Sequence, residues 1–328
     1  MPKIETIELA PGLNICRIIN GMWQVAGGHG VIDSEVALPE MKKFHDAGFT
    51  TWDMADIYGP AELFYGKFNQ NKDDHSVAFT KFVPNPGPMS KSIVDYYIDE
   101  SRKKMNLDCI DLLQFHWWDY TDTNYLDAMK NLETLRDNKK ILHLGLTNFD
   151  TERMQIMVDN GIKFVSNQVQ YSVLDQRPEI KMSDFCKKNN VKLLAYGVLL
   201  GGFLSEKYLG VSEPTRMDTD TSSLQKYKNM IDSWGGWNLF QKLLETLHDI
   251  AKKHNASIAN VATRFILDRP EVAGVIIGAR LGISEHREDN LKTFEISLDD
   301  SDYTSIKSIT DQAHNLYDVI GDCGDEYR

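Results

Sequence analysis

The chain has 328 residues, 42% of them apolar and 26% charged, which is typical of an ordinary globular protein and not of a disordered one. Acidic residues outnumber basic residues by 48 to 36, and the resulting net charge of −12 argues against nucleic acids and anionic membranes as partners. No apolar run approaches the roughly 20 residues that span a bilayer, and the first residues lack the apolar core of a signal peptide. The four cysteines are scattered, so we expect reduced thiols, no metal site and a cytoplasmic location.

Two short strand-like runs, at residues 4–9 and 13–17, flank Pro11-Gly12 and predict an N-terminal β-hairpin. Further strand-like runs then alternate with amphipathic segments, several of which end at Gly or Asn, the residues that stop helices. The expected strands cover residues 15–20, 49–53, 76–81, 109–116, 141–147, 164–168, 191–196 and 272–277. The expected helices cover residues 34–47, 90–105, 125–138, 151–160, 180–189, 238–254 and 258–268.

This alternation of strands and helices predicts a parallel sheet covered by helices. Because there are eight strands of nearly continuous apolar character, we expect a closed (β/α)₈ barrel with residues 1–328 in one domain; an open doubly wound sheet is the alternative. Between residues 197 and 236, clusters of Gly, Ser, Pro, Thr and Asp leave too few periodic apolar residues for a long helix. We expect a lid-like loop there, after strand seven, over the mouth of the barrel.

Titratable residues occur at three neighbouring strand ends, the region where these barrels place their active sites. Asp53 ends the second strand and Tyr58 follows it, while Lys81 and His116 end the third and fourth strands. A nearby ammonium group should lower the pKa of a tyrosine from its usual value near ~10, and an aspartate would keep that ammonium charged inside the barrel. A histidine can polarise a carbonyl group. The set suits hydride addition to a carbonyl, followed by protonation of the alkoxide.

Motifs in this order along the chain resemble those of the aldo-keto reductase family. They are residues 48–59 (GFTTWDMADIYG) with Glu62, residues 107–117 (LDCIDLLQFHW), 144–149 (LGLTNF), 166–172 (SNQVQYS), 275–280 (VIIGAR) and 288–290 (EDN). Together they extend over most of the chain, from about residue 15 to residue 294. One departure is Gly197-Val198-Leu199, which stands where the family commonly has Ser-Pro-Leu.

The resemblance implies a metal-free reductase of a small-molecule carbonyl that uses a nicotinamide cofactor, more often NADP(H) than NAD(H). Asp53, Tyr58, Lys81 and His116 match the catalytic tetrad, with Tyr58 as the general acid. At the nicotinamide end of the cofactor site, Thr147, Asn148 and Gln168 would hold the carboxamide, and Tyr196 would stack under the ring. Residues 197–204 would follow the pyrophosphate. At the other end, Arg280 would meet the 2′-phosphate, and Asp289 and Asn290 would meet the adenine. The full set of implied cofactor residues is Gly21, Met22, Asp53, Thr147, Asn148, Gln168, Tyr196, Gly197, Leu199, Gly202, Gly278, Arg280, His286, Asp289 and Asn290.

Large aromatic residues just beyond strand ends are natural pocket walls in such a barrel. We therefore expect Trp23 and Trp117, with Tyr58 and His116, to line the substrate pocket. Two alternatives remain open. The barrel could bind NADP(H) as a redox-sensing regulatory subunit that acts through a partner protein, as ion-channel β-subunits of the family do, or it could be an unrelated barrel hydrolase or lyase. The sequence does not indicate an oligomeric state.

Overall fold

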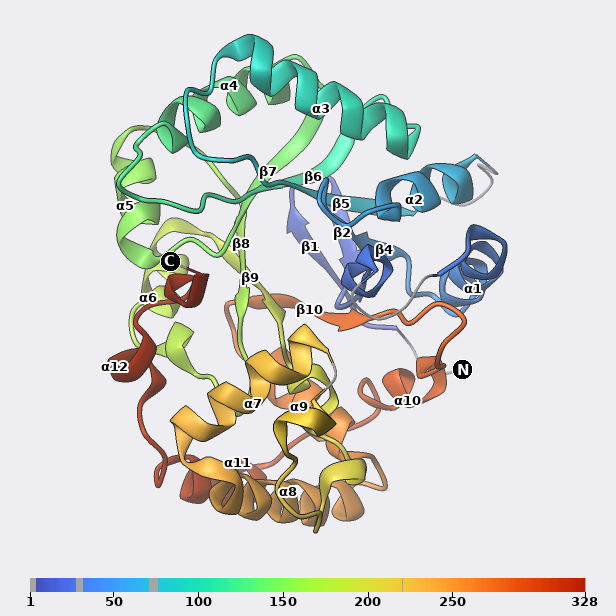
Figure 1. Ribbon diagram of the computed structural model, residues 1–328, viewed down its shortest axis with the longest axis vertical. Coiled ribbons are helices and arrows are strands. Elements are labelled where there is room, and N and C mark those ends of the chain that lie inside the picture. Colours follow the sequence, from blue (N-terminus) through green and yellow to red (C-terminus); the bar gives the residue numbers. More distant parts are fainter. Residues whose placement is uncertain (1–3, 28–31, 71–75, 220, 328) are drawn as a thin grey trace.

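A closed barrel of eight parallel strands organises the chain, in the order β10-β3-β4-β5-β6-β7-β8-β9 (Figure 1). The computed structural model describes residues 4–27, 32–70, 76–219 and 221–327. This architecture confirms the barrel expected from the sequence. The strands are β3 (Ile18–Gly21), β4 (Thr51–Asp53), β5 (Val77–Phe82), β6 (Ile110–Phe115), β7 (Ile141–Thr147), β8 (Ser166–Gln170), β9 (Lys192–Tyr196) and β10 (Val272–Gly278).

Helices cover the outside of the barrel, and several of them begin at a residue whose side chain caps the first turn. Asp33, Ser90, Asp150 and Ser257 each accept a hydrogen bond from a backbone N–H at the start of the following helix. These helices shield strands such as β5 that are buried along their whole length. The covering helices are α1 (Ser34–Asp46), α2 (Ala61–Asn69), α3 (Lys91–Met105), α4 (Tyr125–Asp137), α5 (Thr151–Asp159), α6 (Met182–Asn189), α8 (Gly236–Lys253), α9 (Ile258–Leu267), α10 (Arg287–Lys292) and α11 (Asp300–Thr310).

The expected N-terminal hairpin is present, as β1 (Thr6–Ala10) paired antiparallel with β2 (Leu13–Cys16). Gly12, at a φ of 78°, provides the left-handed turn residue between the two strands. Apolar side chains of the hairpin, among them Leu13 and Ile15, pack against inward-facing residues of the barrel strands. The run at 15–20, expected as one strand, is divided between β2 and β3. The hairpin thus closes the end of the barrel opposite the active-site face.

The segment between residues 197 and 236 differs from the expected loop. It contains three short 3₁₀ turns, η3 (Leu200–Gly202), η4 (Glu206–Tyr208) and η5 (Arg216–Asp218), and then a helix of 13 residues, α7 (Ser222–Trp234). The prediction of no long helix was therefore wrong. Tyr227, Met230, Ile231 and Trp234 do follow helical spacing and are buried, but the polar residues between them obscured that repeat.

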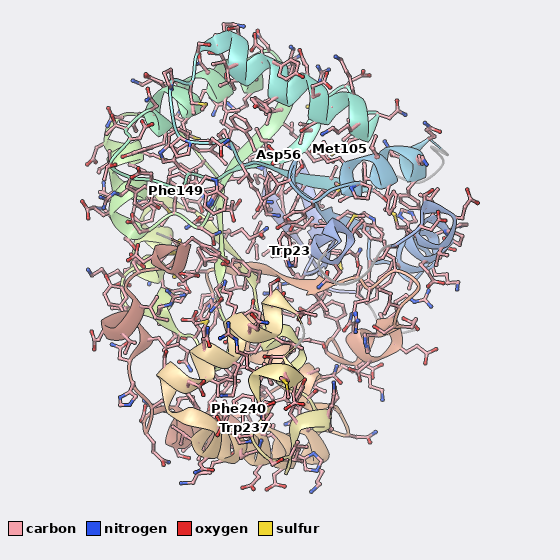
Figure 2. The ribbon with its side chains drawn as sticks, in the orientation of Figure 1. Trp23, Asp56, Met105, Phe149, Trp237 and Phe240 are labelled. Atoms are coloured by element: carbon pink, nitrogen blue, oxygen red, sulfur yellow. The ribbon has the colours of Figure 1, made fainter. Side chains whose placement is uncertain are left out.

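After α11 the chain returns to the mouth of the barrel. Figure 2 shows Trp237 and Phe240 among the lower helices, away from Trp23 near the centre; both are buried, so Trp237 belongs to the core and not to the mouth. After α12 (Leu316–Ile320), residues 321–327, which we call the C-terminal tail, end in the turn η6 (Asp325–Tyr327). Figure 1 shows this end of the chain, in red, beside α5 and α6.

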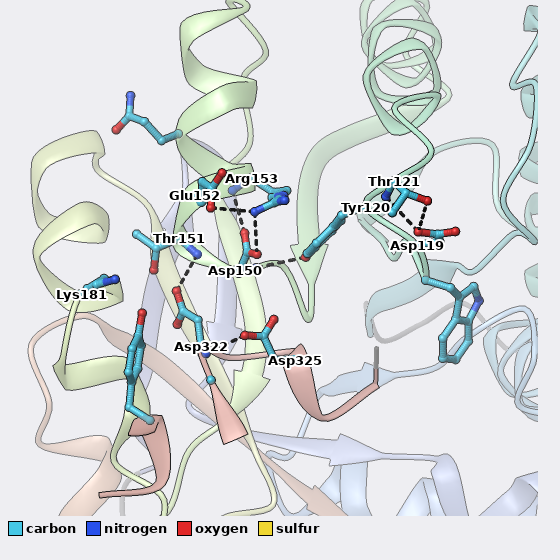
Figure 3. A pocket seen from close by; sticks show the side chains of 14 residues that line it. Asp119, Tyr120, Thr121, Asp150, Thr151, Glu152, Arg153, Lys181, Asp322 and Asp325 are labelled. Carbon is cyan, nitrogen blue, oxygen red and sulfur yellow. Dashed lines mark hydrogen bonds and ion pairs between the residues drawn. The ribbon is translucent and has the colours of Figure 1, made fainter. Parts of the chain in front are cut away.

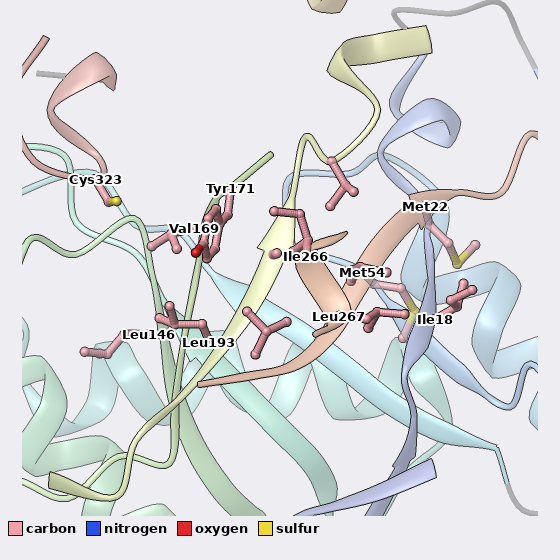
Figure 4. Close-up of a cluster of buried hydrophobic side chains, with 14 of the residues drawn as sticks. Ile18, Met22, Met54, Leu146, Val169, Tyr171, Leu193, Ile266, Leu267 and Cys323 are labelled. Carbon is pink, nitrogen blue, oxygen red and sulfur yellow. The ribbon is translucent and has the colours of Figure 1, made fainter. Parts of the chain in front are cut away.

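The tail is anchored in the core. The Cys323 side chain is fully buried and belongs to the same apolar cluster as Val169 and Tyr171, as Figure 4 shows. Burial raises the pKa of the Cys323 thiol well above its usual value. This residue therefore acts as a small apolar anchor for the tail and not as a reactive thiol.

Candidate active site

The centre of the site is a buried ion pair between neighbouring strands. Lys81 Nζ on β5 lies 2.6 Å from Asp53 Oδ2 at the end of β4, and the two side chains are only 5% and 3% exposed. Lys81 also donates to the carbonyl oxygen of Met54, at 2.9 Å. Burial lowers the pKa of Lys81, and the carboxylate of Asp53 opposes that effect only in part. The sequence predicted this pairing, and the register of the strands, with Asp53 beside Phe79, produces it.

Two amides hold the other oxygen of Asp53. Gln114 on β6 and Gln168 on β8 each donate from Nε2 to Asp53 Oδ1 at 2.8 Å, and Gln168 also donates to Gln114 Oε1 at 2.8 Å. Both side chains are buried. Gln114 was missed in the sequence because its motif drew attention only to the histidine two positions later. The network fixes the orientation of Asp53, since a carboxylate with three donors cannot rotate without losing them.

Tyr58 lies above this pair, in the loop between β4 and α2. Lys81 Nζ is 4.8 Å from the centroid of its ring, and the indole of Trp23 packs edge-on against it at 5.0 Å. Burial raises the pKa of Tyr58 well above its usual value, and the charge of Asp53 acts in the same direction. The structure differs here from the expected lowering by Lys81, because desolvation and the nearby carboxylate outweigh the ammonium group.

His116 follows β6 and is buried at the mouth of the barrel. Its Nδ1 lies 3.1 Å from the carbonyl oxygen of Thr147. A carbonyl oxygen only accepts, so Nδ1 carries a hydrogen in this arrangement. The Nε2 atom then donates a hydrogen bond only when the ring is in its charged, imidazolium form.

The aromatic wall beside His116 differs from the one expected. Trp117 is fully buried, and its indole N–H donates to the carbonyl oxygens of Asp119 and Asp122, so this side chain stabilises the loop beneath the mouth. Trp118, which is 36% exposed, instead packs edge-on against the His116 ring at 4.3 Å. Trp23, 40% exposed, lies on the opposite side with Tyr58, as expected.

The residues expected at the nicotinamide lie together at the ends of β7, β8 and β9. Asn148 accepts a hydrogen bond at Oδ1 from the Tyr196 hydroxyl, at 2.9 Å. The Thr147 hydroxyl and the Asn148 backbone N–H both donate to the carbonyl oxygen of Gln168, at 3.1 and 2.9 Å. These hydrogen bonds bring Thr147, Asn148, Gln168 and Tyr196 together, as the sequence predicted. The side-chain amide of Gln168, however, donates its hydrogen bonds to Asp53 and Gln114.

The segment after β9 has the backbone of a loop that approaches a ligand closely. Gly197, Leu200, Gly201 and Gly202 all have positive φ, at 71°, 49°, 67° and 106°. For a leucine this conformation is strained, and such strain collects at ligand-binding loops. Leu199 lies within the same turn. A Cβ on Gly202 would meet nothing within 4 Å, so the backbone is open there.

The remaining residues expected at the cofactor lie on β3, on β10 and in the chain that follows β10. Gly21 pairs with Gly278, and a Cβ on Gly278 would lie 2.3 Å from Gln24 Nε2. The buried Met22 donates from its backbone N–H to the carbonyl oxygen of Asp53. Arg280 and His286 are exposed, whereas Asp289 Oδ2 already accepts from Ser257 at 3.0 Å, and the Asn290 N–H donates to the carbonyl oxygen of His286 at 2.8 Å.

A cavity of about 1230 Å³ opens beside this mouth, between the loop after β6, the start of α5 and the C-terminal tail (Figure 3). Trp118 belongs both to its wall and to the contact with His116. Its polar lining is Asp119, Tyr120, Thr121, Asp150, Thr151, Glu152, Arg153, Gln155, Lys181, Tyr317, Asp322 and Asp325. The cavity therefore shares Trp118 with the mouth, and the Asp53–Lys81 pair does not line it.

The C-terminal tail carries a functional candidate that sequence reasoning missed. The Tyr327 hydroxyl lies 3.0 Å from the Tyr196 hydroxyl, and its ring packs edge-on to His116 at 6.3 Å. Lys226 of α7 donates a hydrogen bond to the same Tyr327 hydroxyl. No motif marks Tyr327 in the sequence, since only the return of the chain across the barrel brings it to the mouth.

Within the part of the chain that the structure describes, no group of three or more His, Cys, Asp and Glu residues could hold a metal ion. None of the helices described there is long and apolar enough to cross a membrane.

Comparison with known proteins gives the family. A family model described as the aldo/keto reductase family matches residues 17–311. The chain belongs to the aldo/keto reductase family. It is 25% identical over 333 residues to the L-glyceraldehyde 3-phosphate reductase of Escherichia coli O157:H7, with 95% of this chain and 94% of that protein covered. It also matches the structure of a glycerol dehydrogenase from Gluconobacter oxydans, with a TM-score of 0.79, 21% identity and 96% of each chain covered.

A further relative of this aldo/keto reductase is flagellar radial spoke protein 5 of Chlamydomonas reinhardtii, 32% identical over 177 residues. That match covers 48% of this chain but spans only 33% of the length of the flagellar protein. Family membership and the oxidoreductases among the relatives support an oxidoreductase acting on carbonyl compounds.

Proposed function

We propose that this aldo/keto reductase binds NADP(H) and reduces an aldehyde or ketone to the alcohol, with Tyr58 as the proton donor. The observation that carries the proposal is the buried Asp53–Lys81 pair, at 2.6 Å, directly beneath the Tyr58 ring. Burying an ion pair costs desolvation free energy, and titratable groups in such surroundings cluster at functional sites. Here the pair underlies a partly exposed tyrosine at the mouth of the barrel.

The side chains divide the chemistry among them. Because the pKa of Tyr58 is raised, its hydroxyl keeps its proton at neutral pH and can deliver it to a developing alkoxide. Lys81 stabilises the phenolate that remains, and Asp53 holds Lys81 in place. His116, in its imidazolium form, donates from Nε2 to the substrate carbonyl oxygen and orients it. The nicotinamide, when bound, supplies the hydride.

The chain's own residues fit a nicotinamide dinucleotide. The open, positive-φ backbone at Gly202 offers room beside the barrel end where such enzymes hold phosphate. Asn148 and Tyr196 present a side-chain amide and an aromatic ring next to His116, and can hold a carboxamide and a flat ring. Arg280 is exposed beyond β10, so its guanidinium can meet a 2′-phosphate. An exposed arginine at this position is the feature that favours NADP(H) over NAD(H) in our proposal.

The test is the rate of NADPH oxidation with a panel of aldehydes and ketones, for wild type, Tyr58→Phe and the control Tyr303→Phe. We expect Tyr58→Phe to bind NADPH normally and to lose at least about a hundredfold in rate. The control removes a hydroxyl that donates to Asp268 on the outside of the barrel, so its rate should not change. A Tyr58→Phe rate within about threefold of wild type would remove Tyr58 from the mechanism.

The second candidate function is a regulatory subunit that binds NADP(H) and acts through a partner protein. The match to part of a flagellar radial spoke protein is the observation that favours it. The same assay separates the two candidates. Tight NADPH binding without turnover of any carbonyl in the panel would favour the regulatory function.

A further inference from the structure

The side of α7 that faces the barrel lies against the glycine-rich segment after β9. Ser223 and Tyr227 of this helix both come close to Gly201, and the Tyr227 hydroxyl lies 2.5 Å from where a Cβ on Gly197 would be. Lys226 is three positions after Ser223, and its Nζ lies 5.3 Å from the centroid of the Tyr196 ring, directly before Gly197. A cation is therefore held beside Tyr196, where the segment that we propose follows the cofactor pyrophosphate begins.

The surroundings of Lys226 are aromatic. Its Nζ lies 5.3, 5.6 and 4.3 Å from the ring centroids of Tyr196, Tyr227 and Tyr327. The hydrogen bond that the structure gives its ammonium group goes to the Tyr327 hydroxyl, a neutral oxygen. An ammonium group has three donors and bonds more strongly to an anionic oxygen than to a neutral one.

A carboxylate lies nearby but has another cation. Glu326 Oε2 is 2.9 Å from Arg177 Nη1, and Arg177 Nε is 2.8 Å from Asp175 Oδ1. This fully buried guanidinium holds Glu326 in the tail. Lys226 can therefore leave the tail without breaking the ion pair that anchors it.

We propose that Lys226 is a cofactor-binding residue: on binding, its ammonium group exchanges the Tyr327 hydroxyl for a pyrophosphate oxygen of the dinucleotide. The inference rests on the proposed function, because it requires a nicotinamide dinucleotide in the site. In the free protein, the Tyr327 hydroxyl therefore accepts the hydrogen bond from Lys226 that a pyrophosphate oxygen accepts in the complex. Cofactor binding and the contact between the tail and α7 are in competition.

The test measures dissociation constants for NADPH and NADH, without substrate, from the change in intrinsic fluorescence. We expect Lys226→Gln to weaken both cofactors by about tenfold, and by the same factor, because both contain the pyrophosphate. Lys226→Arg should bind within about threefold of wild type, since it keeps the charge. Lys228→Gln is the matched control: it lies on the same helix, but its ammonium pairs with Glu213 and Asp232.

Tyr327→Phe tests the exchange itself. Removing the hydroxyl releases Lys226 in the free protein, so both cofactors should bind about twofold to fivefold more tightly. The proposal is overturned if Lys226→Gln behaves like Lys228→Gln, or if Tyr327→Phe weakens cofactor binding. If wild type binds neither NADPH nor NADH, the proposed function itself fails, and this outcome is distinct from the other two.

Discussion

At the scale of single residues, the buried Asp53–Lys81 ion pair should affect the stability of the fold as well as its chemistry. Either Lys81→Met or Asp53→Asn leaves one buried group without its partner, and such changes cost about 3–5 kcal/mol of unfolding free energy. The double variant removes both charges, so its cost should be clearly smaller than the sum of the two single costs. Chemical denaturation of the four proteins measures this. Additive costs would show that the two groups do not interact.

Arg280 tests the choice of cofactor. Its guanidinium is exposed beyond β10, where we propose that it meets the 2′-phosphate that distinguishes NADPH from NADH. Arg280→Met should weaken NADPH binding by about tenfold or more and leave NADH binding within about twofold. This selective loss contrasts with the equal losses expected for Lys226→Gln. Equal losses for both cofactors in Arg280→Met would refute the assignment.

The sequence located the strand-end residues well, because a buried strand followed by a polar residue is a local signal. Asp53, Lys81 and His116 each stand at such an end, and the barrel brings them to one face. Gln114 was not recognised, since nothing local distinguishes a buried glutamine from a surface one, and Trp117 was preferred to Trp118, since nothing local distinguishes these two neighbours. Which of the two tryptophans is buried depends on which indole N–H can donate to backbone carbonyl oxygens, and only the folded loop determines this.

At the scale of elements, α5 carries a titratable cap. Asp150 caps its N-terminus by accepting from the Arg153 N–H at 2.7 Å, and the tail residue Asp322 accepts from the Thr151 N–H of the same turn. Burial raises the pKa of Asp150 to about 6, against the pull of that backbone hydrogen bond. The carboxyl group is thus more easily ionised in the unfolded chain than in the folded one.

The sign of the pH effect follows from that difference. A raised pKa in the folded state contributes stability that is present below the unfolded value near pH 4 and is lost as the pH rises through 6. Asparagine caps a helix equally well but carries no charge. Asp150→Asn should therefore match wild type near pH 4 and be more stable by up to about 3 kcal/mol above pH 7. Thermal unfolding across this range checks it, and a difference independent of pH would contradict it.

Elements with a strong local repeat were predictable, whereas those that depend on distant contacts were not. Helices such as α3 and α4 appear within a few residues of their expected bounds. The helix α7 was missed because its apolar side chains are spaced among Lys, Asn and Ser, and their interfaces, with the glycine-rich segment after β9, with α8 and with α12, form only in the folded chain. The five-residue helix α12 offers too few turns for a repeat to show.

At the scale of the whole molecule, the two ends of the barrel serve different purposes. At the hairpin end, the guanidinium of Arg17 donates to the carbonyl oxygens of Ala273, Leu267 and Val272 and also to the carboxylate of Glu5. These bonds connect the start of the barrel to α9 and β10, so they stabilise its closure. In this architecture, the residues at the end opposite the mouth affect stability more than chemistry.

This separation gives a prediction. Arg17→Met leaves several part-buried carbonyl oxygens without a donor, so it should lower the unfolding free energy by about 3 kcal/mol or more. NADPH affinity and the rate of the folded enzyme should stay within about twofold of wild type. The control Arg136→Met removes only surface ion pairs and should cost less than about 1 kcal/mol. A large change in NADPH affinity for Arg17→Met would show that the two ends are coupled.

The position of Tyr327 also has a practical consequence. Its ring lies 6.3 Å from that of His116, so the C-terminal tail lies beside the proposed reaction centre, while the hairpin lies at the far end of the barrel. A dye attached to residue 327 or a neighbouring residue of the tail would lie beside the proposed reaction centre and would report on ligand binding there. A surface linkage through the tail would obstruct the mouth, whereas a linkage through the hairpin would leave it open.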